Sequence, residues 1–427
     1  MNKIALELNE TLGGTAAARL LSDFGSRFYF PKGIISQSGE AKKKATRFNA
    51  TVGMATKQNI PLFLPSIQKL ITGLSENEIY PYAPTPGVPE LRSAWKAEME
   101  QKNPSLRGKL TSEPLVTSGL THGIMIVADL FVNAGEKVVV PDMFWGNYRL
   151  IFEGRRQAEL VTFPFFNESG SINLEALEQS LRSCGKKISL VLNFPNNPTG
   201  YSPSMAEARK IVDLLNSLAE EGNDVLCFID DAYFGLFYEE GTLKESLFGL
   251  LADTHENLLA VKFDGATKEE LAWGFRLGFI TYGGKGLSSE QYTALQEKTK
   301  GAIRASISNA SRMAQSLMLK GLQSPSHVKE KEDAFKLLEA RYHKVREVLG
   351  SQGSDSPLTP LPFNSGYFMT FTYRGDAEKL RIHLLDAYGI GTIAIGTKYL
   401  RVAYSSVDIE NIEELYTSIE KAARELL

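Results

Sequence analysis

The sequence has little cysteine, no long apolar run and no excess of charge of one sign. Its 427 residues include two cysteines, Cys184 and Cys227, too few for a disulfide framework or a zinc site. No window approaches about 18 uninterrupted apolar residues, and Glu7 interrupts the apolar start that a secretory signal would need. The 47 basic and 50 acidic residues give a net charge of −3. These absences argue against membrane and nucleic-acid partners and predict a cytoplasmic protein.

Metal and nucleotide motifs are missing as well. The five histidines show no ligand spacing, so we predict no metal site. The sequence has a Gly-containing loop at residues 116–123, ahead of a helix-like stretch at 124–131. Free backbone N–H groups at such a helix start suit a phosphate. The loop lacks both the Gly-Lys-Ser/Thr ending of a P-loop and the dinucleotide pattern Gly-x-Gly-x-x-Gly, which counts against both nucleotide classes.

Short apolar runs alternate with amphipathic stretches between about residues 110 and 310. The runs are rich in β-branched or aromatic residues, as strands buried on both faces should be. They are residues 137–140, 188–192, 224–229, 258–263 and 275–280. One helix-like stretch follows Ser204 and Glu207, which can form a capping box. This alternation predicts an α/β fold with a mostly parallel sheet covered by helices.

The pattern changes near residue 326. A long charged helical stretch at 328–349 is followed by a Gly/Ser/Pro loop at 351–362 and by two further apolar runs, at 367–372 and 399–403. We predict a large domain over residues 50–325. A smaller α+β domain would combine residues 1–49 with residues 326–427.

Polar clusters follow three of the predicted strands, at residues 193–200, 230–233 and 264–268. In an open parallel sheet, ligands bind outside the carboxyl ends of the strands, so the three clusters should converge. They offer an amide, a carboxylate, a phenol and an amine. The sequence therefore predicts a site at this edge of the sheet.

These residues together resemble the class I/II aminotransferases, which are pyridoxal-phosphate enzymes of fold type I. The resemblance covers about residues 49–401 and is strongest at Thr267-Lys268 with Gly274 and Arg276, which looks like the family's cofactor-lysine signature. It implies that pyridoxal 5'-phosphate is the cofactor. Lys268 would bind it covalently and move the substrate proton, and Arg276 would pair with its phosphate.

The resemblance assigns further residues to the cofactor. Asp230 would face the pyridine nitrogen, Tyr233 and Asn197 would hydrogen-bond the ring oxygen, and Trp145 would stack on the ring. Lys268, Asp230 and Tyr233 form the catalytic set. The cofactor-binding residues implied are Gly119, Leu120, Thr121, Trp145, Asn197, Asp230, Tyr233, Thr267, Lys268, Arg276 and Tyr82, the last reaching the neighbouring subunit's phosphate.

The substrate side resembles the aspartate aminotransferase branch. Arg401 would bind the α-carboxylate together with Asn197, Gly53 would belong to a substrate gate, and Arg304 would reach the distal carboxylate across a dimer. The resemblance thus implies a homodimer with a shared active site. It would move an amino group between an L-amino acid, such as aspartate or another dicarboxylate, and a 2-oxo acid such as 2-oxoglutarate.

Two positions depart from the family pattern, and two alternatives stay open. Gly265 stands where the family usually has Ser or Thr, and Tyr148 stands where the aspartate branch often has His. The same scaffold also carries carbon–sulfur lyases, decarboxylases and α-oxoamine synthases, which cofactor motifs do not separate. A ligand-sensing regulator would need a DNA-binding domain, and the residues before 49 leave little room for one.

Overall fold

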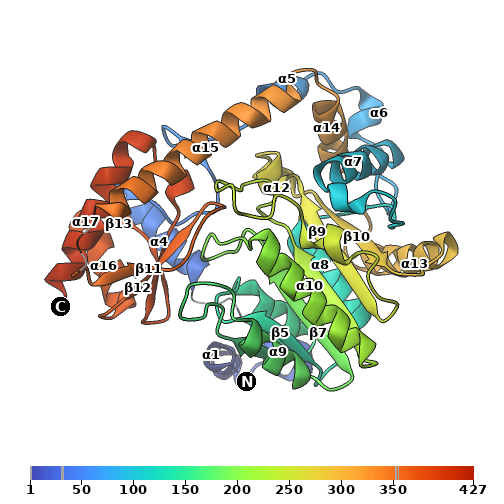
Figure 1. Ribbon diagram of the computed structural model, residues 1–427, viewed down its shortest axis with the longest axis horizontal. Coiled ribbons are helices and arrows are strands. Elements are labelled where there is room, and N and C mark those ends of the chain that lie inside the picture. The colour runs from blue at the N-terminus through green and yellow to red at the C-terminus, as the bar shows by residue number, and fades with distance from the viewer. Residues whose placement is uncertain (1, 30–32, 352, 354) are drawn as a thin grey trace.

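The computed structural model describes residues 2–29, 33–351, 353 and 355–427. Its largest element is a seven-stranded sheet at the centre of the molecule (Figure 1). In spatial order the strands are β4 (Leu115–Thr117), β10 (Gly278–Gly284), β9 (Leu258–Gly265), β8 (Asp224–Asp230), β7 (Lys187–Asn193), β5 (Lys137–Pro141) and β6 (Glu159–Phe163). Strand β10 is antiparallel to both its neighbours, and the remaining neighbouring pairs are parallel. The predicted fold class is confirmed.

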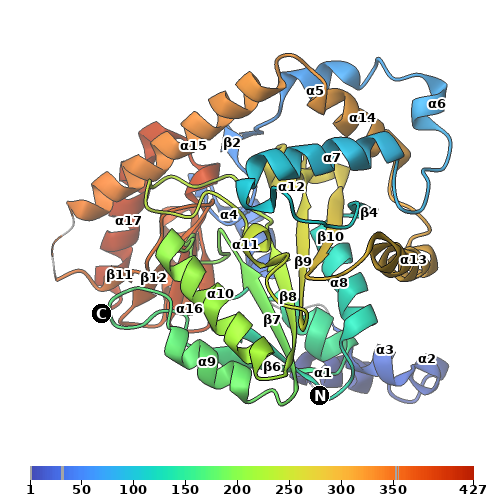
Figure 2. The ribbon, with the colours of Figure 1, turned by 45° about the vertical axis from the view of Figure 1, so that its right-hand side comes forward.

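Helices cover both faces of this sheet (Figures 1 and 2). One face carries α9 (Leu174–Arg182), α10 (Met205–Glu220) and α11 (Leu247–Leu251), and the other carries α8 (Leu120–Phe131) and α13 (Ser289–Ser306). Alternate residues of β8 go to opposite cores: Cys227 and Ile229 pack under the first set, Leu226 and Phe228 under the second. Because both faces are covered, both sets of side chains are apolar, which explains the continuous apolar runs.

Local sequence signals place several of these boundaries. The predicted capping box begins α10: the Glu207 N–H donates to Ser204 Oγ at 3.2 Å, and the Ser204 N–H donates to the Glu207 carboxylate at 2.8 Å. The strand predicted at 275–280 was misplaced, because β10 begins at Gly278. The preceding residues form a short 3₁₀ turn, Trp273–Phe275, and Arg276 adopts a left-handed conformation with φ of 51° that turns the chain into the strand.

A second, four-stranded antiparallel sheet lies beside the first. Its order is β11 (Leu358–Pro360), β12 (Met369–Tyr373), β15 (Tyr399–Val402) and β14 (Ile393–Ile395). The helices α15 (His327–Gly350), α16 (Ala377–Tyr388) and α17 (Ile412–Glu425) share its core. The loop predicted at 351–362 was partly wrong, since it contains β11, which pairs with β12.

The remaining elements flank these two sheets. Helix α4 (Ile34–Lys44) and strand β1 (Phe48–Asn49) join the four-stranded part, where β1 pairs with β13 (Ile390–Gly391), and a small hairpin joins β2 (Thr56–Lys57) to β3 (Ile60–Pro61). Helices α5 (Pro65–Leu70), α6 (Glu76–Ile79), α7 (Pro89–Lys102) and α14 (Arg312–Leu322) pack together at the β4–β10 edge. Helices α1 (Lys3–Leu12), α2 (Ala16–Leu20) and α3 (Asp23–Arg27) lie at the lower edge of the view in Figure 2. The two-domain division stays a prediction.

No helix within the described ranges combines the length and the apolar character needed to cross a membrane.

Candidate active site

A cavity of about 190 Å³ lies at the carboxyl ends of the central parallel strands. The three predicted polar clusters converge there, as the strand topology requires. The lining residues are Leu120, Thr121, Trp145, Asn193, Asn197, Asp230, Ala232, Tyr233, Thr267, Lys268 and Arg276. Every predicted cofactor residue except Gly119 and Tyr82 is among them. The sequence therefore located this pocket closely.

Lys268 is the amine of the pocket. It lies on α12 (Ala266–Glu269), a four-residue helix that directly follows β9, and its Nζ is 4.6 Å from the centre of the Tyr233 ring. Burial lowers the pKa of Lys268 to about 8, although the charge of Asp230 opposes the shift; the positive charge of Arg276 adds to it. A substantial neutral fraction near pH 8 makes this amine a competent nucleophile and base.

Asp230 is the buried carboxylate of the pocket. Burial raises its pKa, while the Tyr148 hydrogen bond and the charge of Lys268 oppose that shift. The Tyr148 hydroxyl donates to Asp230 Oδ2, and the Ala232 N–H donates to Oδ1 at 3.1 Å. Burial also raises the pKa of Tyr148 well above its usual value, so this phenol stays protonated and remains a donor. Tyr148 thus contacts Asp230 from the position where the family pattern often has histidine.

The positive end of the pocket lies where α8 begins beside Arg276. Gly119 precedes this helix with φ of 79°, and a Cβ atom there would lie 2.6 Å from the Arg276 guanidinium. The backbone conformation favours glycine here, and a side chain at this position would displace the Arg276 guanidinium. The guanidinium, the N-terminus of α8 and the hydroxyl-bearing Thr121 and Thr267 make a site suited to a phosphate.

Packing against the neighbouring strand explains why position 265 is a glycine. A Cβ atom at this position would lie 2.5 Å from the Leu277 carbonyl oxygen and 2.8 Å from Gly278 Cα, because β9 and β10 pair at this point. A serine or threonine therefore does not fit there. Thr267, two residues further on, is the hydroxyl that lines the pocket.

Arg401 lies on β15, facing the same region from the four-stranded sheet. Its guanidinium donates to Asn197 Oδ1 at 2.9 Å and to the Thr51 carbonyl at 2.7 Å, and it stacks over the Phe368 ring at 4.3 Å. Its Nε has no hydrogen-bond partner, and within the described residues no carboxylate forms an ion pair with it. Burial lowers its pKa to about 10, so Arg401 is charged at neutral pH. A buried arginine of this kind is ready for a ligand carboxylate.

Gly53 lies close to this arginine region. A Cβ atom there would approach the Tyr233 hydroxyl to 3.0 Å and Phe368 Cζ to 3.1 Å. The Trp273 indole donates to the Gly53 carbonyl at 3.0 Å, which ties this segment to the turn that follows Lys268. The predicted gate residue thus lies beside the pocket.

Two predicted residues lie away from the pocket of their own chain. Tyr82 is 90% exposed, and neither it nor Arg304 lines the cavity. The Arg304 guanidinium donates to Ser308 Oγ near the end of α13. Their role in a neighbouring subunit's site stays a prediction.

Sequence reasoning missed several residues at or near the site. Asn193 is the last residue of β7: its amide donates to the Asp230 carbonyl at 2.8 Å, and its oxygen accepts from the Asn197 N–H at 2.8 Å. Its place at a strand end could have identified it. Ala232 also lines the cavity, whereas Thr51 and Phe368 contact Arg401 from distant parts of the chain, where no local pattern indicates them.

Comparison with known families agrees with this geometry. The model of the family described as aminotransferase class I and II matches residues 55–419. The chain belongs to the class I and II aminotransferases. One relative is an aspartate aminotransferase of Sulfurisphaera tokodaii, 24% identical over 343 residues, covering 76% of this chain and 78% of the relative. The family is an enzyme family, so this aminotransferase moves amino groups between amino acids and 2-oxo acids.

Solved structures share the fold. A crystal structure of an aminotransferase from Anaerococcus prevotii has a TM-score of 0.83 at 22% identity and covers 95% of this chain and 99% of its own. A kynurenine aminotransferase of Pyrococcus horikoshii, solved in complex with PMP, has a TM-score of 0.79 at 16% identity, covering 98% of this chain and 99% of its own. At these identities the likeness concerns the fold alone.

The cofactor of this aminotransferase is pyridoxal 5'-phosphate, and the pocket residues fit it. When bound, this group withdraws electrons from the substrate α-carbon. The amine of Lys268 matches its aldehyde, the carboxylate of Asp230 matches its ring nitrogen, and the site around Gly119 and Arg276 matches its phosphate.

Proposed function

We propose that this aminotransferase transfers the amino group of a dicarboxylic L-amino acid, such as aspartate, to a 2-oxo acid such as 2-oxoglutarate. The observation that carries the amino-acid part of the proposal is Arg401, a buried, charged guanidinium beside the cofactor pocket whose Nε has no hydrogen-bond partner among the described residues. The preference for a dicarboxylic donor depends on Arg304. A substrate α-carboxylate would supply the missing anion. Arg304 would bind the second carboxylate from the neighbouring subunit.

The other pocket residues take complementary roles in this proposal. Lys268 holds the cofactor in the resting enzyme and, once released, moves a proton to and from the substrate α-carbon. Asp230 keeps a proton on the ring nitrogen, and the Tyr148 hydrogen bond stabilises its charge. Asn197 orients Arg401, and Tyr233 lies beside the amine. Fixing the carboxylate at Arg401 directs the α-hydrogen toward Lys268.

We infer a homodimer from the surface near Tyr82 and Arg304. Large apolar side chains are exposed on neighbouring elements there: Tyr80 and Tyr82 follow α6, and Met313 lies at the start of α14. Arg312 donates to the Asn77 carbonyl at 3.5 Å, joining α14 to α6. Exposed apolar patches of this kind commonly mark protein interfaces. The cytoplasmic location stays a prediction.

Single amino acids supplied with 2-oxoglutarate test the substrate. Purified enzyme should form glutamate fastest with aspartate or another dicarboxylic donor, and Arg304→Ala should lower kcat/KM for that donor more than for alanine. Glutamate formation from neutral donors alone, or a decarboxylated or eliminated product in place of a 2-oxo acid, would contradict the proposal.

Mixed dimers test the shared site. Lys268→Ala subunits, expected to be inactive as homodimers, and Arg304→Ala subunits, expected to have a lowered kcat/KM toward aspartate, are unfolded together and refolded. If Arg304 acts across the dimer, one site in each hybrid has both residues and activity returns. No recovery, although hybrids form, would place Arg304 in its own subunit's site or outside the mechanism.

A further inference from the structure

Glu270, two residues after Lys268, is a completely buried carboxylate that lies outside the cofactor pocket. Its oxygens lie 2.6 Å from Lys331 Nζ and 2.7 Å from His327 Nε2, both on α15. Burial alone would raise the pKa of Glu270, but the charge of Lys331 and the His327 hydrogen bond outweigh it and lower the pKa. Glu270 is therefore ionised and held by the first two turns of α15.

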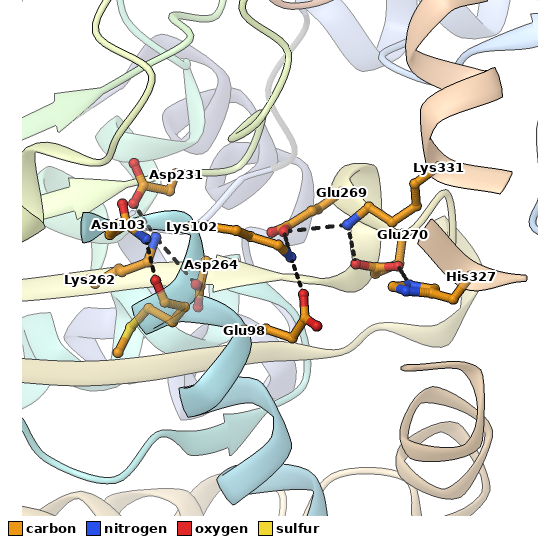
Figure 3. Close-up of polar contacts among 11 residues, drawn as sticks. Glu98, Lys102, Asn103, Asp231, Lys262, Asp264, Glu269, Glu270, His327 and Lys331 are labelled. Atoms are coloured by element: carbon orange, nitrogen blue, oxygen red, sulfur yellow. Dashed lines mark hydrogen bonds and ion pairs between the residues drawn. The ribbon is translucent and has the colours of Figure 1, made fainter. Parts of the chain in front are cut away.

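Glu269 makes the matching connection on the other side. Its carboxylate lies 2.6 Å from Lys102 Nζ at the end of α7 and 3.6 Å from Lys331. Lys102 is held in turn by Glu98, one turn earlier on α7, at 2.8 Å. Figure 3 shows the Lys331 amine between the two carboxylates, with Lys102 on the other side of Glu269 and His327 on the other side of Glu270.

The helix that carries Lys268 cannot hold its own geometry. With only four residues, α12 is far below the length at which a helix is stable alone. It is followed by Leu271, a bulky residue in the left-handed region with φ of 53°. Such a conformation persists only where the surroundings determine it.

Close packing supplies only part of that support on the side of α15, where Ala334 packs against the core that contains Ala266 and Leu271. A cavity of about 580 Å³ separates α15 from the loop at residues 234–240, and both Lys268 and Glu269 line it together with Phe335 and Leu338. The ion pairs at its edge therefore connect α12 to α15. Directional ion pairs fix geometry even where they add little net stability compared with apolar packing.

We propose that Glu269 and Glu270 are positioning residues for Lys268: by pairing with Lys102 of α7 and with Lys331 and His327 of α15, they hold the short helix so that the amine points at the cofactor. This inference rests on the proposed role of Lys268. It assigns a function to the acidic pair that follows the lysine in the sequence.

The test uses a variant that removes both charges of one pair, Glu270→Gln with Lys331→Met, so that no unpaired charge is buried. We expect the rate at which added pyridoxal 5'-phosphate attaches to Lys268 in the cofactor-free full-length protein to fall about tenfold, the size expected from a small misplacement of a reacting group. Amide hydrogen exchange over residues 264–275 should become faster. At saturating cofactor, kcat should fall while KM changes little.

Asp408→Asn is the matched control. It breaks the buried pair between Arg341 and Asp408, which are 2.9 Å apart, further along the same helix α15 and remote from α12. This control should lower the urea midpoint while leaving the attachment rate and the exchange of α12 at wild-type values. If the double variant does not fold, Glu270→Gln alone is measured in its place, because Lys331 is 22% exposed and keeps its contact with Glu269 at 3.6 Å, so no fully buried charge loses its partner.

If the double variant folds and keeps the wild-type rates of cofactor attachment and amide hydrogen exchange, the inference is wrong. Glu269 and Glu270 would then have a merely structural role. Failure of the proposed function looks different. In that case borohydride would not trap the cofactor on Lys268 in the wild-type enzyme, whatever the variants do.

Discussion

Two lysines on the same strand-to-helix segment, the buried Lys262 and the half-buried Lys268, have opposite surroundings. Lys262 on β9 contacts Asp231 and lies 3.2 Å from Asp264 (Figure 3). Burial lowers the pKa of Lys262, but these two carboxylates outweigh it and raise the pKa. Lys268 has no ion-pair partner among the described residues, and burial lowers its pKa to about 8. The first charge is satisfied by the protein, whereas the second is left for a ligand.

Two buried arginines, Arg341 and Arg401, differ in the same way. Arg341 on α15 pairs with Asp408 at 2.9 Å, whereas the hydrogen-bond partners of Arg401 among the described residues, Asn197 and the Thr51 carbonyl, are neutral. A buried charge without a counter-charge is costly, so it persists where a ligand completes it. In both comparisons, the group with a protein counter-charge has a structural role, and the group without one is available to bind a ligand.

The largest expected effect is that of Lys268→Ala. Removing the acid–base group and the covalent anchor should lower kcat by about four orders of magnitude. Thermal unfolding should change little, because the amine pairs with no protein carboxylate. A transamination assay against Lys262→Met, which should keep measurable activity, checks this; equal losses in both variants would remove the distinction.

Arg401→Ala should come next. Losing the guanidinium that binds the α-carboxylate should cost about 3 kcal/mol, or roughly 10²-fold in kcat/KM, mostly through KM. Arg401→Lys should recover only part, because an ammonium cannot make the forked contact. Steady-state kinetics with several donors measures this. The same loss for every donor is expected, since every donor has an α-carboxylate.

Lys262→Met should affect stability instead. It leaves two buried carboxylates, Asp231 and Asp264, without their cation, which should lower the free energy of unfolding by about 3–5 kcal/mol. Urea unfolding measures the change. The double variant with Asp231→Asn should recover part of it. An unchanged urea midpoint would show that this cluster is not a stabilising element.

Measuring the rate of cofactor attachment over a range of pH tests the lowered pKa of Lys268. Only the neutral amine attacks an aldehyde, so the rate of cofactor attachment should rise with pH and level off above about 8. Below that midpoint it should fall about tenfold per pH unit. Stopped-flow absorbance measures the rate. A midpoint near the ordinary lysine value of about 10.5 would show that burial does not shift this amine.

The smallest expected effect is that of Tyr148→Phe. The ring keeps its packing against Trp145, at 5.6 Å between centroids, but Asp230 loses a charged hydrogen bond. Such bonds contribute about 1.5–3 kcal/mol, so kcat should fall about tenfold. Steady-state kinetics measures this, with Tyr233→Phe, whose hydroxyl does not bond Asp230, as the comparison.

Strand ends and spacing predicted the pocket because both depend on local sequence. Asp230 ends a buried strand, Lys268 and Asn197 each follow one, and the parallel topology brings such positions together. The support around them could not be predicted, because it is formed by residues distant in sequence. Glu270 meets Lys331 from α15, and Gly265 is dictated by the neighbouring strand. The start of β10 was misplaced because a left-handed residue, Arg276, leaves no pattern in composition.

The most direct test compares the two lysines in one measurement. Enzyme loaded with pyridoxal 5'-phosphate is reduced with borohydride and digested, and the modified peptide is identified by mass spectrometry. The contrast between a lysine paired with carboxylates and one without an ion-pair partner among the described residues predicts the reduced cofactor on Lys268 and none on Lys262. Modification of Lys262, or of an exposed lysine while Lys268 stays free, would contradict it.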